Sequence, residues 1–313
     1  MEYLFPISGV KTYLWLPPLV AFVVSCSTSM GGVSGAFLLL PFQMSFLDFT
    51  SPAVSPTNLV FNVVAIPSGV WRYLREGRMV WPLTWVVVLG TLPGVIIGCF
   101  IRLHWLPYPQ TFKAFVGCVL FYISLRMLVE VNKARQAAAQ KAKLGPKLEA
   151  QVVTQNFTVQ TLEFNWRRVA YEFQGRRYAC TPLGIFSMAF IVGIVGGVYG
   201  IGGGAIIAPF FVAIYGLPVH TVAGAALMGT FITSLTGVLF YQALAFIPAY
   251  AGMHVAPDWL LGSLFGLGGV CGMYLGARTQ RFVPAKWIKL GLALLLLFVA
   301  GHYLLDFAAY LGR

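Results

Sequence analysis

The stretch "GGVYGIGGGAIIAPFF", residues 196–211, places six glycines in nine positions and then adds a proline. Both residue types destabilise helices, glycine through its conformational freedom and proline through its missing N–H group. The residues before and after this stretch are strongly apolar. The sequence therefore predicts a helix that breaks inside an apolar segment, and the rest of the chain is interpreted around that break.

The composition indicates an integral membrane protein. The 313 residues are 58% hydrophobic and 10% charged, with a mean hydropathy of +0.80, which is far above the value for soluble domains. Apolar runs of spanning length recur and are continuous rather than alternating, so we expect an all-α polytopic membrane protein and no barrel. The amino terminus lacks a basic region and carries Glu2, so we expect it to lead into a first spanning helix, without a cleaved signal peptide.

The positive charges predict an orientation in the membrane. Of the 21 lysines and arginines, 17 lie in three places: residues 72–78, 126–177 and 278–289. If these segments face the cytoplasm, one topology follows from the positive-inside rule. The net charge of +12 then reflects orientation and anionic lipid. We expect the lipid bilayer as a partner and no nucleic acid.

The chain contains an internal repeat. At an offset of 168 residues, glycines, prolines and aromatic residues match in register, including Gly32/Gly200, Gly35/Gly203, Pro41/Pro209 and Tyr73/Tyr241. A second block matches at an offset of 178, with Gly90/Gly268, Gly94/Gly272 and Gly98/Gly276, so the second copy gains ten residues around Ile247–Pro257. Each copy is predicted to contain about five membrane segments, including a glycine-broken helix and a long helix (about Pro52–Arg75 and Val219–Leu244).

An odd number of crossings inverts the second copy relative to the first. The charges agree, because the loop at residues 72–78 is basic and its counterpart at 245–257 has no lysine or arginine. We therefore predict two inverted repeats, residues 1–131 and 183–313, with both termini outside. A cytoplasmic linker, residues 132–182, is expected to contain a small β-hairpin. The linker is either a regulatory or partner-binding module or a tether between the halves, and we favour the tether.

The glycine breaks are the predicted binding site. An irregular backbone survives in a membrane only where protein or a water-filled cavity satisfies it. In transporters with inverted repeats, paired breaks place half-helix N-termini, with their free N–H groups, toward anionic substrates. The spacing of Gly94/Gly98 and Gly272/Gly276, in contrast, is typical of ordinary helix packing.

The polar residues favour an anion over a cation. The nine acidic residues and the four histidines fall near span ends or in loops, so no internal carboxylate is expected. Asn58 and Asn62 are spaced to share one helix face, and Thr230 is the counterpart of Asn62. The predicted substrate-binding residues are Gly32, Ser34, Gly35, Asn58, Asn62, Gly200, Gly202, Gly203, Gly204, Thr230 and Thr233. No catalytic residue, metal or cofactor is expected.

The five cysteines suggest neither a disulfide framework nor a metal site, because they form no CxxC pair. Cys26 and Cys271 lie in apolar segments and could in principle relay sulfur. Small apolar filling is the more ordinary role of such a cysteine, and we favour it.

The motifs "GGVSGAFLLLPF", "GGVYGIGGGAIIAPFF" and "GVCGMYLGARTQRFVP" resemble the TauE/SafE family of membrane transporters. The resemblance covers both halves but not the linker. It implies movement of sulfite or an organosulfonate, typically export, although members are also linked to other sulfur compounds and small carboxylates. The first copy has Ser34 and Ala36 where the second has Gly202 and Gly204, so the two breaks need not contact substrate equally.

We therefore expect a secondary transporter of a small sulfur-containing anion, working by alternating access in the inner (plasma) membrane, and not an enzyme. The alternatives are an anion channel, a cysteine-dependent sulfur relay, and a thiosulfate or small-carboxylate transporter. The sequence does not fix the oligomeric state and is compatible with a homodimer.

Overall fold

The computed structural model describes residues 2–31, 34–144, 159–165, 167–173, 175–279 and 285–312. The predicted site residue Gly32 lies outside these ranges. The helices of the first half, in chain order, are α1 (Leu16–Gly31), α2 (Ala36–Ser45), α3 (Val54–Ala65), α4 (Pro67–Arg75), α5 (Trp81–His104) and α6 (Pro109–Leu144).

The second half has a similar but not identical order of elements. It consists of α7 (Pro182–Tyr199), the short 3₁₀ helix η2 (Gly203–Ile206), α8 (Ile207–Tyr215), α9 (Val219–Ala245), η3 (Pro248–Met253), α10 (Trp259–Thr279) and α11 (Ala285–Leu311). The ten extra residues of the second copy coincide with η3 and its flanks.

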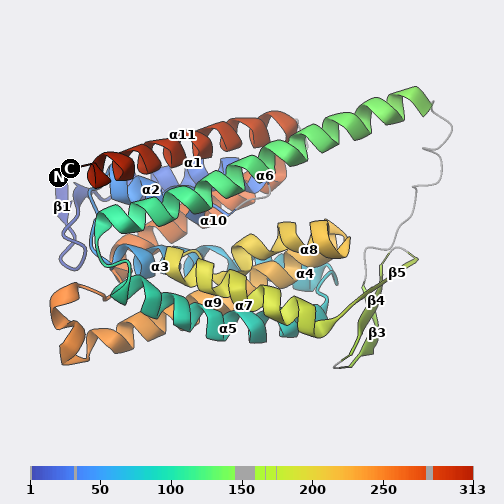
Figure 1. Cartoon of the computed structure of the whole chain (residues 1–313), viewed down its shortest axis with the longest axis horizontal. Helices are drawn as coiled ribbons and strands as arrows, with labels where there is room; N and C mark the ends of the chain where they lie inside the picture. The colour runs from blue at the N-terminus through green and yellow to red at the C-terminus, as the bar shows by residue number, and fades with distance from the viewer. Residues whose placement is uncertain are drawn as a thin grey trace.

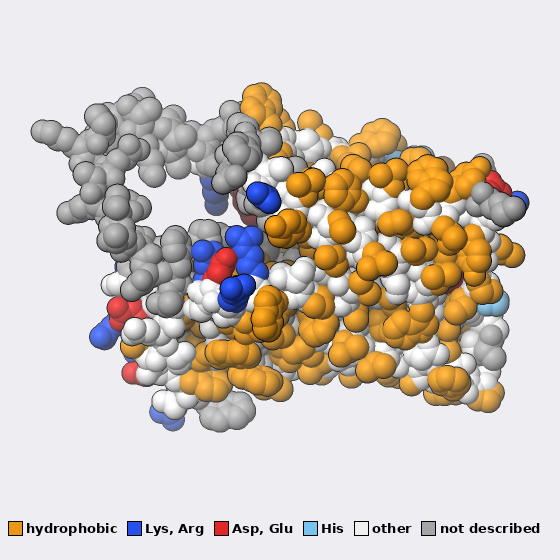
Figure 2. Space-filling view, turned by 180° about the vertical axis from the view of Figure 1, so that it is seen from behind, with side chains coloured by type: hydrophobic (Ala, Val, Ile, Leu, Met, Phe, Trp, Pro, Cys, Tyr) orange, Lys and Arg blue, Asp and Glu red, His pale blue; other side chains and the backbone are white. Residues whose placement is uncertain are grey.

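The helices make this a polytopic membrane protein. Within the described ranges, parts of α5, α6, α7, α9, α10 and α11 are long and apolar enough to span a membrane, and α1 and α2 are shorter apolar helices. Hydrophobic side chains cover most of the face seen in Figure 2, and lysines and arginines gather on that face mainly near the end that carries the linker strands.

Two small sheets lie at opposite ends of the helical bundle (Figure 1). At the end with both termini, β1 (Glu2–Leu4) and β2 (Lys11–Tyr13) form an antiparallel hairpin with Tyr3 opposite Thr12. At the other end, the linker forms the antiparallel sheet β3 (Gln160–Phe164), β4 (Val169–Phe173) and β5 (Arg176–Cys180). The sequence pattern predicted neither the terminal hairpin nor the third strand of the linker.

The long helices pack as pairs that cross between the halves. α5 lies along α7, α1 along α10, and α6 along α11. A Cβ atom at Gly94 would collide with the carbonyl oxygen of Phe190, and one at Gly272 would collide with that of Phe22. Gly94 and Gly272, and likewise Phe22 and Phe190, are matched positions of the two copies, so the same close helix contact occurs twice. This agrees with the packing role predicted for these glycines.

The first long helix is not continuous. The sequence predicted one helix over about Pro52–Arg75, but α3 ends at Ala65 and α4 starts at Pro67. Proline lacks the N–H group that would continue the helical ladder and its ring crowds the preceding turn, so the helix breaks there. In the second copy, α9 has no proline in its interior and is uninterrupted.

Candidate functional site

The second glycine break is built by two residues in conformations that favour glycine. α7 ends at Tyr199, and Gly200 has φ 80° and ψ 32°. Gly202 has φ 78° and ψ 145°, a region that a side chain makes costly. The N–H groups of Gly200 and Ile201 both bond to Gly196 O, at 2.9 and 3.1 Å. The chain then re-enters helical structure at η2 and α8.

Other helices contact this backbone directly. A Cβ atom at Gly200 would lie 2.7 Å from Ser55 Cα, and one at Gly203 would lie 2.8 Å from Thr91 Cβ. At Gly204 it would collide with the carbonyl oxygen of Ala226 on α9. The glycines are therefore required by close packing from α3, α5 and α9 as well as by backbone conformation.

Asn58 joins the two breaks. Its Nδ2 group donates to Ala36 O at 3.2 Å, directly after the first break, and to Gly200 O at 2.9 Å, inside the second. Tyr199 also spans them, because its hydroxyl donates to Phe37 O at 3.0 Å. These side chains are fully buried. The core thus brings together two segments that are more than 160 residues apart in sequence.

Asn62 and the threonines of α9 line the same region. Asn62 Nδ2 donates to Ile201 O at 2.8 Å and to Ser234 Oγ at 3.3 Å. Thr233 Oγ1 accepts a bond from Gly203 N at 3.1 Å. Thr230 Oγ1 bonds to Ala226 O of its own helix at 2.8 Å, and Gly202 packs against Thr230. In this conformation, the donors of both asparagines and the N–H of Gly203 are used by protein groups.

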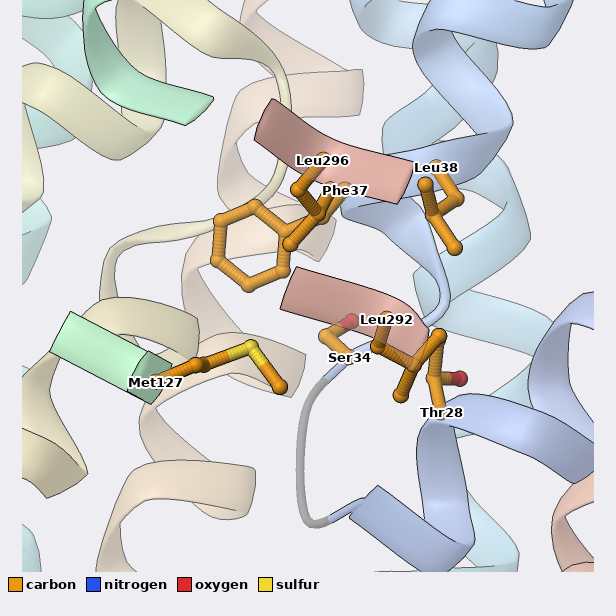
Figure 3. Close-up of a pocket in the computed structure, with 7 residues that line it drawn as sticks. All are labelled: Thr28, Ser34, Phe37, Leu38, Met127, Leu292 and Leu296. Carbon is orange, nitrogen blue, oxygen red and sulfur yellow. The ribbon is translucent and has the colours of Figure 1, made fainter. Parts of the chain in front are cut away.

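The first break has different neighbours. Gly35 precedes α2 and packs against Ser25 and Thr28 of α1, and Ser34 Oγ accepts a 3.3 Å bond from Ala36 N. Figure 3 shows a small pocket beside this break, lined by Thr28, Ser34, Phe37, Leu38, Met127, Leu292 and Leu296. Most of this lining is apolar, so the pocket offers few donors to an anion.

Two buried acceptors near the breaks have no donor among the described residues: Gln43 Oε1 and Asn62 Oδ1. Their orientations follow from their neighbours, since Gln43 Nε2 donates to Asn58 Oδ1 at 3.3 Å and Asn62 Nδ2 faces a carbonyl oxygen. Sequence reasoning did not select Gln43. Its one signal was a lone amide within the apolar run of α2.

Arg102 is the second residue that sequence reasoning missed. It was not among the predicted site residues, but it lies in the last turn of α5 and is 0% exposed. Its Nε donates to Ser55 Oγ at 3.3 Å and its Nη1 donates to Leu106 O. The guanidinium carbon lies 3.7 Å from the centre of the Phe112 ring. Burial at the end of a span is not visible in hydropathy, which is why the sequence did not reveal it.

The cysteines show no shared site. Cys99 and Cys180 are buried, Cys118 and Cys271 are exposed, Cys26 is intermediate, and all are free thiols. Among the residues that the structure describes, no group of three His, Cys, Asp or Glu side chains is placed to hold a metal ion.

Comparison with known proteins shows which family the chain belongs to. A family model described as "Sulfite exporter TauE/SafE" matches residues 18–303. The "Probable membrane transporter protein YunE" of Bacillus subtilis (strain 168) is 23% identical over 278 residues, covering 87% of this chain and 90% of that protein. The "Probable membrane transporter protein YdhB" of the same organism is 29% identical over 101 residues, covering 32% of this chain and 37% of that protein. No solved structure matches the chain significantly. Since the family model spans nearly the whole chain, the protein belongs to the TauE/SafE family of membrane transporters.

Proposed function

We propose that this protein is a secondary transporter that moves a small sulfur-containing anion, sulfite or an organosulfonate, out of the cell by alternating access. The observation that carries the proposal is the buried meeting of the two glycine breaks at the Asn58 amide. Membrane transporters bind substrates at such breaks because unwound backbone offers polar groups in the middle of the bilayer. The description of the matching family, a sulfite exporter, supports the choice of anion.

Two inverted repeats supply the mechanism. The helix pairs α5 with α7 and α1 with α10 repeat the same glycine contacts in the two copies. In Figure 1, α1 starts at the end with the termini and α7 starts at the opposite end, beside β5. Repeats related in this way can exchange conformations, so that the site opens first to one side of the membrane and then to the other.

The substrate site in this proposal comprises both breaks and the polar residues that face them. The N–H groups at Gly32, Ser34 and Gly35 and at Gly200, Gly202, Gly203 and Gly204 are donors, and Asn58, Asn62, Thr230 and Thr233 complete the site. In the conformation described here, several of these groups bond to each other. An arriving anion takes over those donors as α3 and α9 shift relative to α7.

The transporter is proposed to lie in the inner membrane with both termini outside and the linker in the cytoplasm. The positive charges of residues 72–78, 126–177 and 278–289 support this orientation. The linker acts as a tether between the halves.

The function is tested by counterflow of radiolabelled sulfite in proteoliposomes of the purified protein. Unlabelled sulfite, sulfoacetate, thiosulfate, sulfate and acetate are trapped inside in turn. Accumulation of label driven by trapped sulfite or sulfonate establishes a carrier and ranks its substrates. If the label equilibrates without counterflow, the protein is an anion channel and not a carrier. If the label does not move, sulfite is not the substrate.

The site is tested separately with a Gly203→Leu variant. Thr91 Cβ leaves no room for a side chain there, so transport should be lost while membrane insertion is retained. Gly301→Ala is the matched control, because nothing lies within 4 Å of a Cβ atom at that position. Unchanged transport by Gly203→Leu would exclude the second break from the site.

A further inference from the structure

A buried arginine without a carboxylate partner lies beside the second glycine break. Arg102 is 0% exposed, and none of the ion pairs among the described residues includes it. Removing a guanidinium from water costs several kcal/mol unless an opposite charge compensates it. The hydroxyl, the carbonyl and the aromatic ring that Arg102 contacts provide partial compensation and no negative charge.

The same region contains two buried polar groups that have no oxygen or nitrogen partner among the described residues. The Nε and Nη1 groups of Arg102 have partners, but its Nη2 group has none among the described residues. Tyr241 of α9 is fully buried next to Cys99 and close enough to Arg102 to interact electrostatically. Its hydroxyl has no oxygen or nitrogen partner in the described part of the chain, and its neighbour is the thiol of Cys99, a weak acceptor.

These unpaired groups complement an oxyanion. The free Nη2 group of the guanidinium can donate charge-assisted hydrogen bonds to the oxygens of an anion, and the tyrosine hydroxyl can add a further donor. Near the breaks the unpaired atoms are two amide oxygens, Gln43 Oε1 and Asn62 Oδ1, and the Ser25 hydroxyl, none of which carries a positive charge. A water molecule could satisfy the N–H and O–H groups but would not neutralise the charge.

Ser55 connects this spot to the break. Its Oγ accepts the bond from Arg102 Nε, and its Cα and carbonyl oxygen pack against Gly200, each 2.7 Å from the position a Cβ would take. Arg102 is two residues from the last residue of α5, and that end of α5 lies at the end of the bundle that carries the termini (Figure 1). An anion on Arg102 would therefore lie directly next to the break, on that side.

We propose that Arg102 and the Tyr241 hydroxyl bind the charged oxygens of the transported anion, on the side of the second break that faces the termini. This rests on the proposed function and names its charge-recognising residues. The breaks and the asparagines bind the polar part of the substrate as proposed above, and Arg102 adds selection for a sulfite- or sulfonate-type oxyanion by its charge and its Nη2 donors.

The test is anion-dependent thermal stabilisation of the purified protein in detergent, with sodium sulfite and methanesulfonate as probes and sodium chloride at equal ionic strength as the reference. Four variants are compared with the unmodified chain: Arg102→Gln, Arg102→Lys, Tyr241→Phe and, as a matched control, Arg75→Gln. Arg75 is an exposed arginine of α4. Counterflow of sulfite is measured on the same preparations.

The oxyanions should raise the melting temperature of the unmodified chain and of Arg75→Gln, and Arg102→Gln should lose this shift together with counterflow. Arg102→Lys keeps the charge without the Nη2 donors, so it should retain only part of the shift. Tyr241→Phe removes one hydroxyl, and the anion concentration giving half the shift should rise about tenfold, the effect of one charge-assisted hydrogen bond.

An Arg102→Gln variant that keeps the full oxyanion shift overturns the inference and leaves the proposed function standing. If Arg102→Gln does not fold, the Tyr241→Phe variant tests the inference instead. An unchanged anion concentration for half of the melting-temperature shift would overturn the proposal that Tyr241 and Arg102 bind the anion together. If the unmodified chain shows neither shift nor counterflow with any sulfur oxyanion, the proposed function fails instead.

Discussion

At the scale of single residues, Gly204 is the most constrained position of the second break. A Cβ atom there would meet the Ala226 carbonyl oxygen and would lie 2.6 Å from Thr230 N, and both are backbone atoms of α9. Because backbone cannot move aside without shifting the helix, Gly204→Ala should destabilise the protein by about 1–3 kcal/mol and abolish most transport. Thermal unfolding in detergent and sulfite counterflow measure the two effects.

The control for Gly204→Ala is again Gly301→Ala in α11, where a Cβ atom meets nothing within 4 Å. Alanine is the better helix former by about 1 kcal/mol, so this variant should be as stable as the original chain or slightly more stable. Equal melting temperatures for the two variants would show that α9 does not pack tightly on the break.

The matched positions Asn62 and Thr230 should respond differently to loss of their polar groups. Asn62→Ala leaves Ile201 O without its 2.8 Å partner, and an unsatisfied buried carbonyl costs about 1–3 kcal/mol. Thr230→Val removes only a bond to its own helix, so its cost should stay below about 1 kcal/mol. The melting temperatures of the two variants compare these costs. An equal decrease in melting temperature would mean that the Asn62 hydrogen bond does not hold the break in place.

The sequence supports only part of this site. It selects Gly200, Asn58 and Asn62, because glycine clusters and amides stand out against an apolar background. It misses Arg102 and Gln43, because a charge at a span end and a single amide give the same pattern whether they are buried or exposed. The partners of the asparagines, Gly200 O and Ile201 O, depend on tertiary packing that no local pattern encodes.

At the scale of elements, the apolar helical character is accessible from the sequence, while the lengths, interruptions and ends of the helices are less so. The sequence predicted about five membrane segments in each half, and six of the described helices are long and apolar enough to span a membrane. The proline at position 67 was visible, but prolines inside membrane helices are often tolerated, so its effect on α3 and α4 required the structure. The β1–β2 hairpin has three-residue strands, too short for an alternation to be recognised. It is fixed by long-range bonds, since Ser8 N and Ser8 Oγ both donate to Asp258 Oδ2.

One of the hydrogen bonds that attach the linker sheet to the helical bundle can be tested through its side chains. Tyr171 of β4 is fully buried, and its hydroxyl lies 2.9 Å from Thr221 Oγ1 in the first turn of α9. Tyr171→Phe should destabilise this docking by about 1 kcal/mol and speed proteolysis of the linker. Tyr178→Phe is the control, because the ring of Tyr178 is only half-buried and stacks on the ring of Tyr171.

The docking should also depend on pH in one direction. Burial raises the pKa of Tyr171 above its ordinary value, so the folded state favours the protonated hydroxyl. The stabilisation is therefore complete below the ordinary tyrosine pKa of about 10, and it falls as the pH rises from there through the raised pKa. Proteolysis of the linker that accelerates between pH 7 and 9 would contradict this assignment.

At the scale of the whole molecule, the halves are interleaved rather than side by side. Each half contributes one helix to each major pair, and the Asn58 amide of the first half bonds to the break of the second. A movement of one half therefore has to change the polar contacts at the breaks. This coupling is what an alternating-access carrier requires and what a rigid pore does not need.

The orientation of the molecule gives the last prediction. The termini and the linker sheet lie at opposite ends (Figure 1), and most lysines and arginines belong to the linker side, so that side should face the cytoplasm. In a chain whose native cysteines other than Cys180 are replaced, a membrane-impermeant maleimide applied to intact cells should label an Ile7→Cys variant and not an Ala179→Cys variant. Both positions are exposed. Inside-out vesicles should give the reverse.

Cys180 serves as the internal control for this labelling and can stay in place. Burial raises its pKa to about 11, and the thiolate is the form that reacts with maleimide. At pH 7 the thiolate fraction of Cys180 is far below that of an exposed cysteine, whose pKa is about 8.5, and the side chain is buried, so Cys180 should stay unlabelled in either preparation while the adjacent exposed position reacts. Labelling of Ala179→Cys in intact cells would invert the topology, and the linker would then meet the outside solution while the Arg102 end of the bundle faced the cytoplasm.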